Sequence, residues 1–164
     1  MNSKRVTYFI IILLVITVLG CTNNKIRQNE TIAKSLAEAW STHDIDKLTS
    51  LFAEDCLYEE VAAGKKYENK KAIAEYANYT LSGVPDSEFE IVSIIVNDNM
   101  ATAEWIWKAT NTVGWPGAPP NNKYFEVRGV SVMVIEDNLI KRNSDYWDLN
   151  TFLKGIGVPP SDEP

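Results

Sequence analysis

Residues 100–112 read MATAEWIWKATNT and have the most regular alternation in the chain. The apolar residues Ala101, Ala103, Trp105, Trp107 and Ala109 fall on one side, and mostly polar residues occupy the positions between them. A period of two residues is typical of a β-strand with one buried face. We therefore expect a long strand whose apolar side covers the core.

More strands are expected before and after this one. A short strand is predicted over residues 56–61, and a longer one around residues 89–95, where Phe89, Ile91 and Ile95 would share a face. Two more are predicted over residues 124–135 and 139–147, joined by the turn Asp137-Asn138. The segment 124–135 is apolar at most positions, which predicts that both of its faces are covered.

Helical spacing of apolar residues precedes most of these strands. It predicts helices over residues 30–40, 45–52 and 70–81, with Asp44 and Asn69 as N-caps of the last two. A helical turn is expected from Leu149 onward. Helices followed by a run of long strands predict an α+β fold, in which a curved mixed sheet wraps around the N-terminal helices. Such a sheet encloses an apolar pocket, a common place for a ligand.

The first 20 residues have the pattern of a secretory signal peptide. Lys4 and Arg5 precede an apolar run over residues 6–20, which is shorter than the roughly 20 residues that span a bilayer. The run ends in VLGC at 18–21, which resembles the lipobox of bacterial-type lipoproteins. The resemblance implies cleavage before Cys21 and lipidation of its thiol; the alternative is an uncleaved signal anchor. In both cases we expect the domain outside the cytoplasm, held at the cell membrane or envelope.

The remainder divides into a polar tether over residues 21–29, a domain over 30–158 and a tail over 159–164. The net charge of −6 argues against nucleic acid as a partner, because phosphate binding needs a basic face. With Cys21 lipidated, Cys56 has no partner for a disulfide, and we expect it to be buried packing. His43 is the only histidine, which argues against a metal site and against a Ser–His–Asp triad.

Several segments together resemble the SnoaL-like branch of the nuclear-transport-factor-2-like superfamily, over nearly all of the expected domain. They are Ala39-Trp40 with HDIDKL (43–48) and LFAED (51–55), then GWPGAPP (114–120) before FEVRGVSV (125–132), and finally DYWD (145–148) with Phe152-Leu153 and Ile156-Gly157.

This resemblance implies a cone-shaped α+β fold with a deep apolar pocket, and it allows a homodimer through the outer face of the sheet. Its enzymes include polyketide cyclases, which close a ring by an intramolecular aldol reaction without a metal or an organic cofactor. Other members are isomerases, dehydratases or epoxide hydrolases, and many only bind a ligand or a partner. The fold therefore does not settle the function.

In the cyclases an aspartate on the last strand is the general acid/base, and the resemblance places that role at Asp145. Burial in an apolar pocket would raise the pKa of such a carboxyl toward neutrality. The cyclases support it with imidazole groups, whereas this chain has Ser131 and Asn143 at the matching places. These side chains can hydrogen-bond and polarise a carbonyl, but they do not titrate near neutral pH. Asp148 would point away from Asp145 and cap the terminal helix.

The aromatic residues Tyr58, Trp105, Trp107 and Trp147 would line a pocket for a flat apolar ligand or simply fill the core. Trp115 lies in a loop rich in Gly and Pro, and we expect it to form a lid over the mouth of the pocket.

Arg128 has two interpretations, a pocket cation facing Asp145 or a structural ion-pair partner. Two functions follow from the sequence. One is a cofactor-free acid/base enzyme, an aldol-type cyclase or isomerase acting on a small apolar carbonyl compound. The other is a non-catalytic module that binds a small apolar molecule or a protein.

Overall fold

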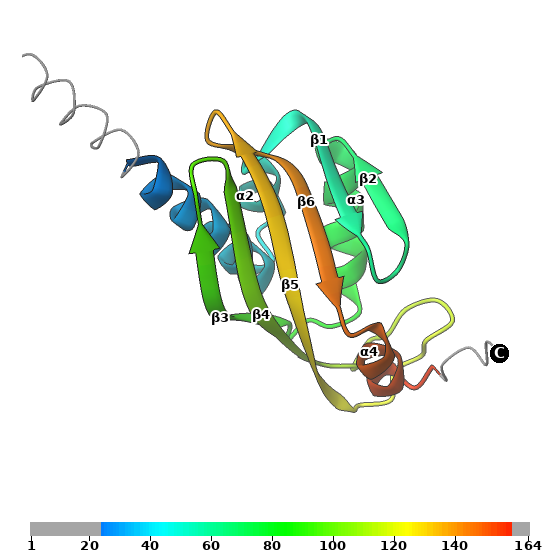
Figure 1. The fold of residues 1–164 in the computed structure, drawn as a ribbon. Helices are drawn as coiled ribbons and strands as arrows, with labels where there is room; N and C mark the ends of the chain where they lie inside the picture. The colour runs from blue at the N-terminus through cyan, green and yellow to red at the C-terminus, as the bar shows by residue number, and fades with distance from the viewer. Residues whose placement is uncertain (1–23, 159–164) are drawn as a thin grey trace, which may run out of the picture.

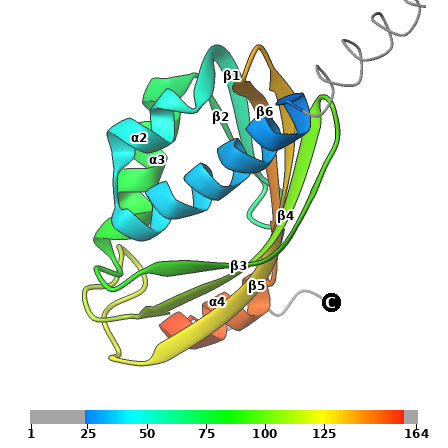
Figure 2. The same cartoon turned by 90° about the vertical axis from the view of Figure 1, so that its left-hand side faces the viewer.

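A computed structural model describes residues 24–158, which form a layer of helices packed on a curved sheet (Figures 1 and 2). The helical layer consists of residues 24–42, α2 (Ile45–Ser50) and α3 (Lys70–Ser82), and Figure 2 shows all three on one side of the sheet. The sheet has the order β2-β1-β6-β5-β4-β3 and does not close. This confirms the expected α+β class. The strands are β1 (Phe52–Glu60), β2 (Lys65–Glu68), β3 (Glu88–Val96), β4 (Met100–Thr110), β5 (Tyr124–Glu136) and β6 (Leu139–Trp147).

Strand β4 alternates strictly between buried and partly exposed residues, as its sequence predicts. It pairs with β3 and β5 in antiparallel fashion, and Trp105 stands opposite Gly129 on β5. Strand β1 runs parallel to β6, and this pairing sets Glu60 beside Asp145. The sheet thus brings the end of an early strand next to the last strand.

The helices begin where their capping residues predict. The side chains of Asp44, Asn69 and Asp148 each accept a hydrogen bond from the backbone N–H three residues further on, at 2.8, 3.1 and 3.0 Å. Asp148 caps α4 (Leu149–Ile156), which ends at Gly157 in the left-handed conformation.

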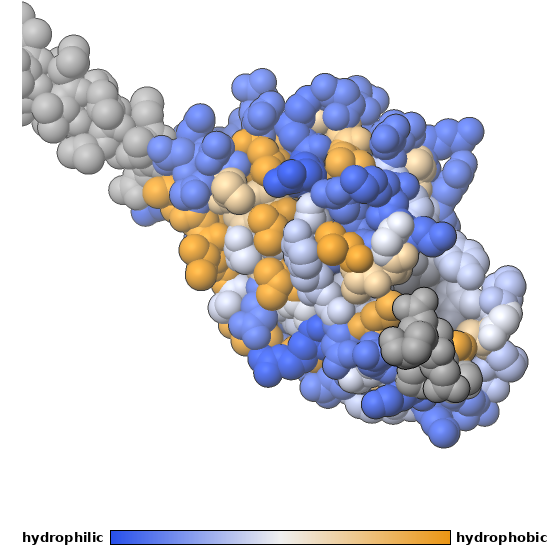
Figure 3. All heavy atoms as spheres, turned by 45° about the vertical axis from the view of Figure 1, so that its right-hand side comes forward, coloured by the Kyte–Doolittle hydropathy of each residue, from blue (hydrophilic) through white to orange (hydrophobic). Residues whose placement is uncertain are grey.

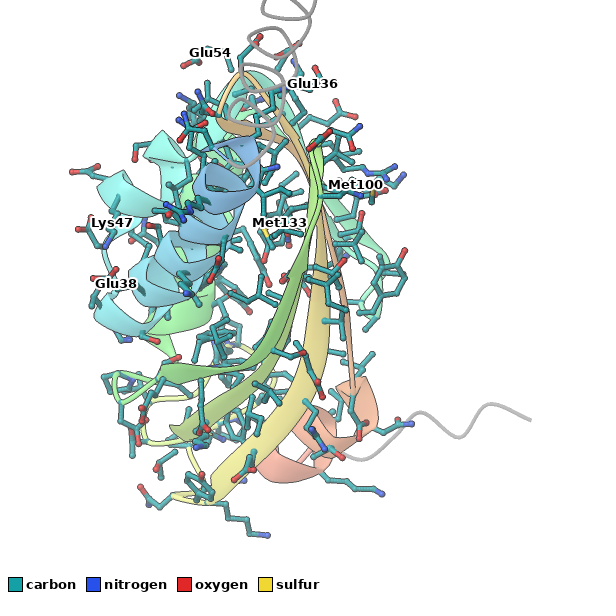
Figure 4. The ribbon with its side chains drawn as sticks, turned by 60° about the vertical axis from the view of Figure 1, so that its left-hand side comes forward. Glu38, Lys47, Glu54, Met100, Met133 and Glu136 are labelled. Carbon is teal, nitrogen blue, oxygen red and sulfur yellow. The ribbon has the colours of Figure 1, made fainter. Side chains whose placement is uncertain are left out.

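The core has two apolar clusters. The larger one lies between the helical layer and the sheet; it contains Cys56 and also Met133, which points into the interior in Figure 4, whereas Glu38 and Lys47 lie on the outside of the helices. The second cluster lies at the α4 end of the sheet and consists of Val84, Trp105, Trp107, Ala109, Ala118, Phe125, Val127 and Ile156.

The structure differs from the sequence expectations about the elements in three places. Residues 24–29, expected to be a tether, belong to the helix that continues to residue 42, and Asn29 is buried and donates to the Asn97 carbonyl at 2.8 Å. Phe52 starts β1 instead of ending a helix, because it pairs with Ile140 on β6. Residues 65–68, for which no strand was predicted, form β2 and pair with the end of β1.

The faces of two strands also differ from the prediction. Strand β5 buries only one of its faces, and its other face is open or half-exposed. On β3 the register shifts between Ile91 and Ser93, so Ile95 moves to the outer face and is 73% exposed. The exposed apolar side chains Val92, Ile95 and Tyr146 contribute to a mixed outer surface, and Figure 3 shows apolar atoms there among polar ones.

The expected signal peptide, Cys21 and the tail over 159–164 lie outside the described residues. Between residues 24 and 158, none of the helices has the length and apolar character required to cross a bilayer.

Candidate active site

Asp145 lies at the centre of a buried hydrogen-bond network on the inner face of the sheet. Its Oδ1 accepts hydrogen bonds from the Ser131 Oγ at 2.6 Å and from the Asn143 Nδ2 at 2.7 Å. Its Oδ2 accepts a short hydrogen bond from the Tyr58 hydroxyl, and the Trp105 Nε1 donates to the Ser131 Oγ at 2.9 Å. The structure therefore brings five of the predicted site residues together.

The strand register explains this convergence. Ser131 on β5 stands opposite Asp145 on β6, and Asn143 precedes Asp145 by two residues on the same face. Tyr58 on β1 pairs with Asn143 from the other side. Three neighbouring strands thus supply the carboxyl group and its donors.

Burial is the main influence on the pKa of Asp145, which it raises, and the three hydrogen bonds oppose the shift. Because the side chain is only 6% exposed, the net effect is a raised pKa. Burial and the nearby charge of Asp145 also raise the pKa of Tyr58 well above its ordinary value. Tyr58 therefore remains a neutral donor to the carboxyl group.

Glu60 is a second buried carboxyl group, and the sequence interpretation missed it. It ends β1 beside Asp145 and is 4% exposed. The Tyr76 hydroxyl donates to its Oε1 and the Trp147 Nε1 to its Oε2, both at 2.5 Å. A signal was present, because Tyr58 and Glu60 are two residues apart on one strand and so share the inner face.

Burial, and after it the charge of Asp145, raises the pKa of Glu60 to about 7, against the hydrogen bonds that it accepts. Two carboxyl groups on adjacent strands thus share one apolar region, where the ionisation of one disfavours that of the other. Such a pair can hold one exchangeable proton near neutral pH.

A cavity of about 450 Å³ opens between β2, α3, the loop after β4 and α4. Its size suits a small organic ligand. Glu60 lies in its wall, and most of the other lining side chains are apolar or aromatic: Tyr67, Tyr76, Tyr79, Trp107, Trp115, Trp147, Leu149, Phe152, Ile156 and Val158.

Asp145 does not reach this cavity. It lines two small voids of about 20 and 30 Å³ instead, the second of which also touches Glu60. The expectation that Asp145 is the carboxyl group of the pocket is therefore corrected, because the carboxyl group that meets the cavity is that of Glu60.

The predicted aromatic residues divide between the cavity and the surroundings of Asp145. Trp107, Trp115 and Trp147 line the cavity, whereas Tyr58 and Trp105 belong to the inner layer around Asp145. The Trp115 Nε1 donates to the Tyr79 carbonyl at 3.0 Å, which ties the loop to the end of α3. Its ring contacts that of Phe152 edge-on, with centroids 5.7 Å apart.

Arg128 is exposed on the outer face of the sheet and pairs with Glu104 at 2.8 Å. Its position on β5 has the opposite parity to Ser131, so its side chain points away from Asp145. The interpretation of Arg128 as a pocket cation is therefore wrong, and it is a structural ion-pair partner.

With this geometry in place, comparison with known proteins identifies the family. The model of the family described as SnoaL-like polyketide cyclase matches residues 30–156. The chain belongs to this family. Among curated proteins, none matches it in sequence.

Solved structures with the same fold have low sequence identity to the chain. A putative SnoaL-like polyketide cyclase from Jannaschia sp. CCS1 has a TM-score of 0.73 at 16% identity, covering 82% of this chain and 94% of that one. IdmH, a putative polyketide cyclase from Streptomyces antibioticus, has a TM-score of 0.70 at 20% identity, covering 80% and 99%.

A hypothetical protein with a ketosteroid isomerase-like fold from Catenulispora acidiphila, in complex with trimethylamine, has a TM-score of 0.68 at 22% identity, covering 81% of this chain and 97% of that one. At these identities the likeness defines the fold alone.

Proposed function

We propose that the domain is a cofactor-free acid/base enzyme, an aldol-type cyclase or isomerase, acting on a small apolar carbonyl compound, with Glu60 as the group that exchanges protons with the ligand. The observation that carries the proposal is a buried carboxyl group in the cavity wall with a pKa raised to about 7. A general base is most useful when its pKa is close to the working pH.

In the proposed step, the Glu60 carboxylate removes a proton from the carbon next to the ligand carbonyl. The products are an enolate and a protonated Glu60. In an isomerase the proton held by Glu60 returns to another carbon. In a cyclase the enolate carbon attacks a second carbonyl carbon, so that a C–C bond forms as the π bond of that carbonyl breaks, and the resulting alkoxide oxygen takes the proton from Glu60.

The surrounding residues have supporting roles in this proposal. Tyr76 and Trp147 hold the two Glu60 oxygens, and so fix the orientation of the carboxyl group. Asp145, supported by Ser131 and Asn143, acts through its charge, which disfavours ionisation of Glu60. Asp145 is thus a positioning residue that tunes the proton affinity of Glu60.

Deuterium exchange tests the proposal without knowledge of the natural substrate. The full-length chain is incubated in D₂O with 2-acetonaphthone and 2-indanone, and loss of the α-proton signals is followed by ¹H NMR. We expect exchange above the buffer rate, and a loss of at least about 100-fold in Glu60→Gln. Glu59→Gln is the matched control, since Glu59 lies on the other face of β1 and pairs with Lys66. An equal rate in Glu60→Gln and the parent chain would refute the role of Glu60.

A binding module is the second candidate, favoured by the three donors that satisfy Asp145 away from the cavity. In that function the aromatic cavity captures a small apolar molecule, and Glu60 only orients it. Measurable binding of the same ketones without any exchange would favour this candidate.

We also propose that the domain is anchored outside the cytoplasm by a lipid on Cys21, as the VLGC motif after the apolar run indicates. A homodimer through the outer sheet face is consistent with the exposed Val92, Ile95 and Tyr146.

A further inference from the structure

The cavity has two charged residues among its described lining, Glu60 and Lys65. They stand directly opposite each other in the antiparallel β1–β2 pair, so both side chains leave the same face of the sheet. Glu60 is 4% exposed, whereas Lys65 is exposed. The acid therefore lies deep in the cavity, and the cation lies at its mouth.

Lys65 has no ion-pair partner between residues 24 and 158. The Glu60 oxygens already accept from Tyr76 and Trp147, and among the described residues no hydrogen bond or ion pair joins Lys65 to them. Its neighbour Lys66 differs, because it points to the other face and pairs with Glu59 at 3.0 Å. A cation that faces an apolar cavity without a partner is available to an anionic ligand.

Two phenols lie on the same side of the cavity. Tyr67 on β2 and Tyr79 on α3 both line it, and neither hydroxyl donates to another described residue. Burial, and after it the charges of Glu60 and Tyr79, raise the pKa of Tyr67. Lys65, Tyr67 and Tyr79 together provide a cation and two hydroxyl donors.

We infer that the ligand of this cavity is an aromatic or polycyclic carbonyl compound that also carries a carboxylate, held at the mouth by Lys65, Tyr67 and Tyr79. The carbonyl end lies at Glu60; this half rests on the proposed function, whereas the carboxylate half does not. One lysine in a chain of net charge −6 suits a monoanion better than a doubly charged phosphate. The position of Glu60 deep in the cavity sets the orientation of the ligand, because its negative charge repels the ligand carboxylate toward the mouth.

Matched probes test this inference. The full-length chain is titrated at pH 8 and low salt with 6-acetyl-2-naphthoate and with its neutral methyl ester, and binding is followed by quenching of tryptophan fluorescence. The acid should bind about five-fold more tightly than the ester, as for one partly exposed ion pair. Lys65→Gln should abolish this preference. Lys66→Gln is the control and should retain it, since Lys66 faces outward.

The inference is overturned if the ester binds as tightly as the acid, or if Lys65→Gln keeps the preference. Glu60→Gln separates it from the proposed function, because this variant should lose proton exchange and still prefer the acid. If the parent chain prefers the acid over the ester but exchanges no α-protons, the result supports the proposed ligand class and contradicts the proposed enzymatic function. If the parent chain exchanges α-protons but binds acid and ester equally, the result supports the enzymatic function and overturns the proposed ligand class.

Discussion

At the scale of single residues, the site depends on two carboxyl groups with different surroundings. Asp145 accepts three hydrogen bonds and is enclosed. Glu60 accepts two and meets the cavity. The pKa values of both are raised by burial, so each binds protons more tightly in the folded chain than in the unfolded chain.

The pH dependence of stability follows from these shifts. Glu60 has a pKa of about 7 when folded and 4.5 as its ordinary value, so the unfolded chain releases this proton at lower pH. The free energy of unfolding should therefore fall from pH 4.5 to pH 7, by on the order of 2–3 kcal/mol. Urea denaturation at pH 5 and pH 7.5 measures this, and the fall should be much smaller in Glu60→Gln. An equal fall in that variant would assign the effect to other groups.

At the scale of elements, the β4–β5 pair holds the inner layer of the site. Trp105 stands opposite Gly129, and a Cβ at Gly129 would lie 2.2 Å from the Trp105 ring. The absence of a side chain there leaves room for the six-membered ring of the indole beside Gly129, while the indole N–H donates to Ser131. Gly129 therefore affects Asp145 indirectly, because it allows the position of Trp105, which donates to the Ser131 that holds Asp145.

Gly129→Ala tests this arrangement. The added methyl group must displace the Trp105 ring, and we expect a loss of about 1–3 kcal/mol in stability by urea denaturation. The same substitution should cost much less in a Trp105→Leu background, because the smaller side chain leaves room. Additive costs of the two substitutions would show that the ring and the glycine are not coupled.

The sequence predicted the elements better than the contents of the cavity. Alternation identified β4, and the caps Asp44, Asn69 and Asp148 marked where helices begin. Glu60 was missed because its burial depends on the parallel pairing of β1 with β6, which joins residues distant in the chain. Arg128 was ambiguous because the apolar residues on both sides of β5 hid its parity, and Ile95 was misplaced because a register shift leaves no local signal.

At the scale of the whole molecule, the cavity opens at the α4 end of the sheet. The helix over residues 24–42 follows directly from the segment that contains Cys21. Figure 1 shows that this helix enters at the far side of the domain from α4. A tether at the N-terminus would therefore leave the mouth of the cavity accessible.

The proposed anchor predicts a lipid on one cysteine. In a bacterial host, the parent chain should incorporate labelled palmitate and sediment with the membranes, and Cys21→Ser should take up no label. Cys56→Ser is the control and should remain labelled, because Cys56 is buried in the core. A parent chain that sediments with the membranes without any label, at the mass of the unprocessed chain, would instead indicate an uncleaved signal anchor.

The proposed chemistry requires that Glu60 exchange a proton near neutral pH in the cavity wall. A ¹³C NMR titration of the side-chain carboxyl groups, with Glu60→Gln to assign the resonance, measures it directly. We predict a pKa of about 7 for Glu60, and a lower value in Asp145→Asn, where the neighbouring charge is removed. A pKa near the ordinary 4.5, unchanged in Asp145→Asn, would contradict a proton-exchanging role for Glu60.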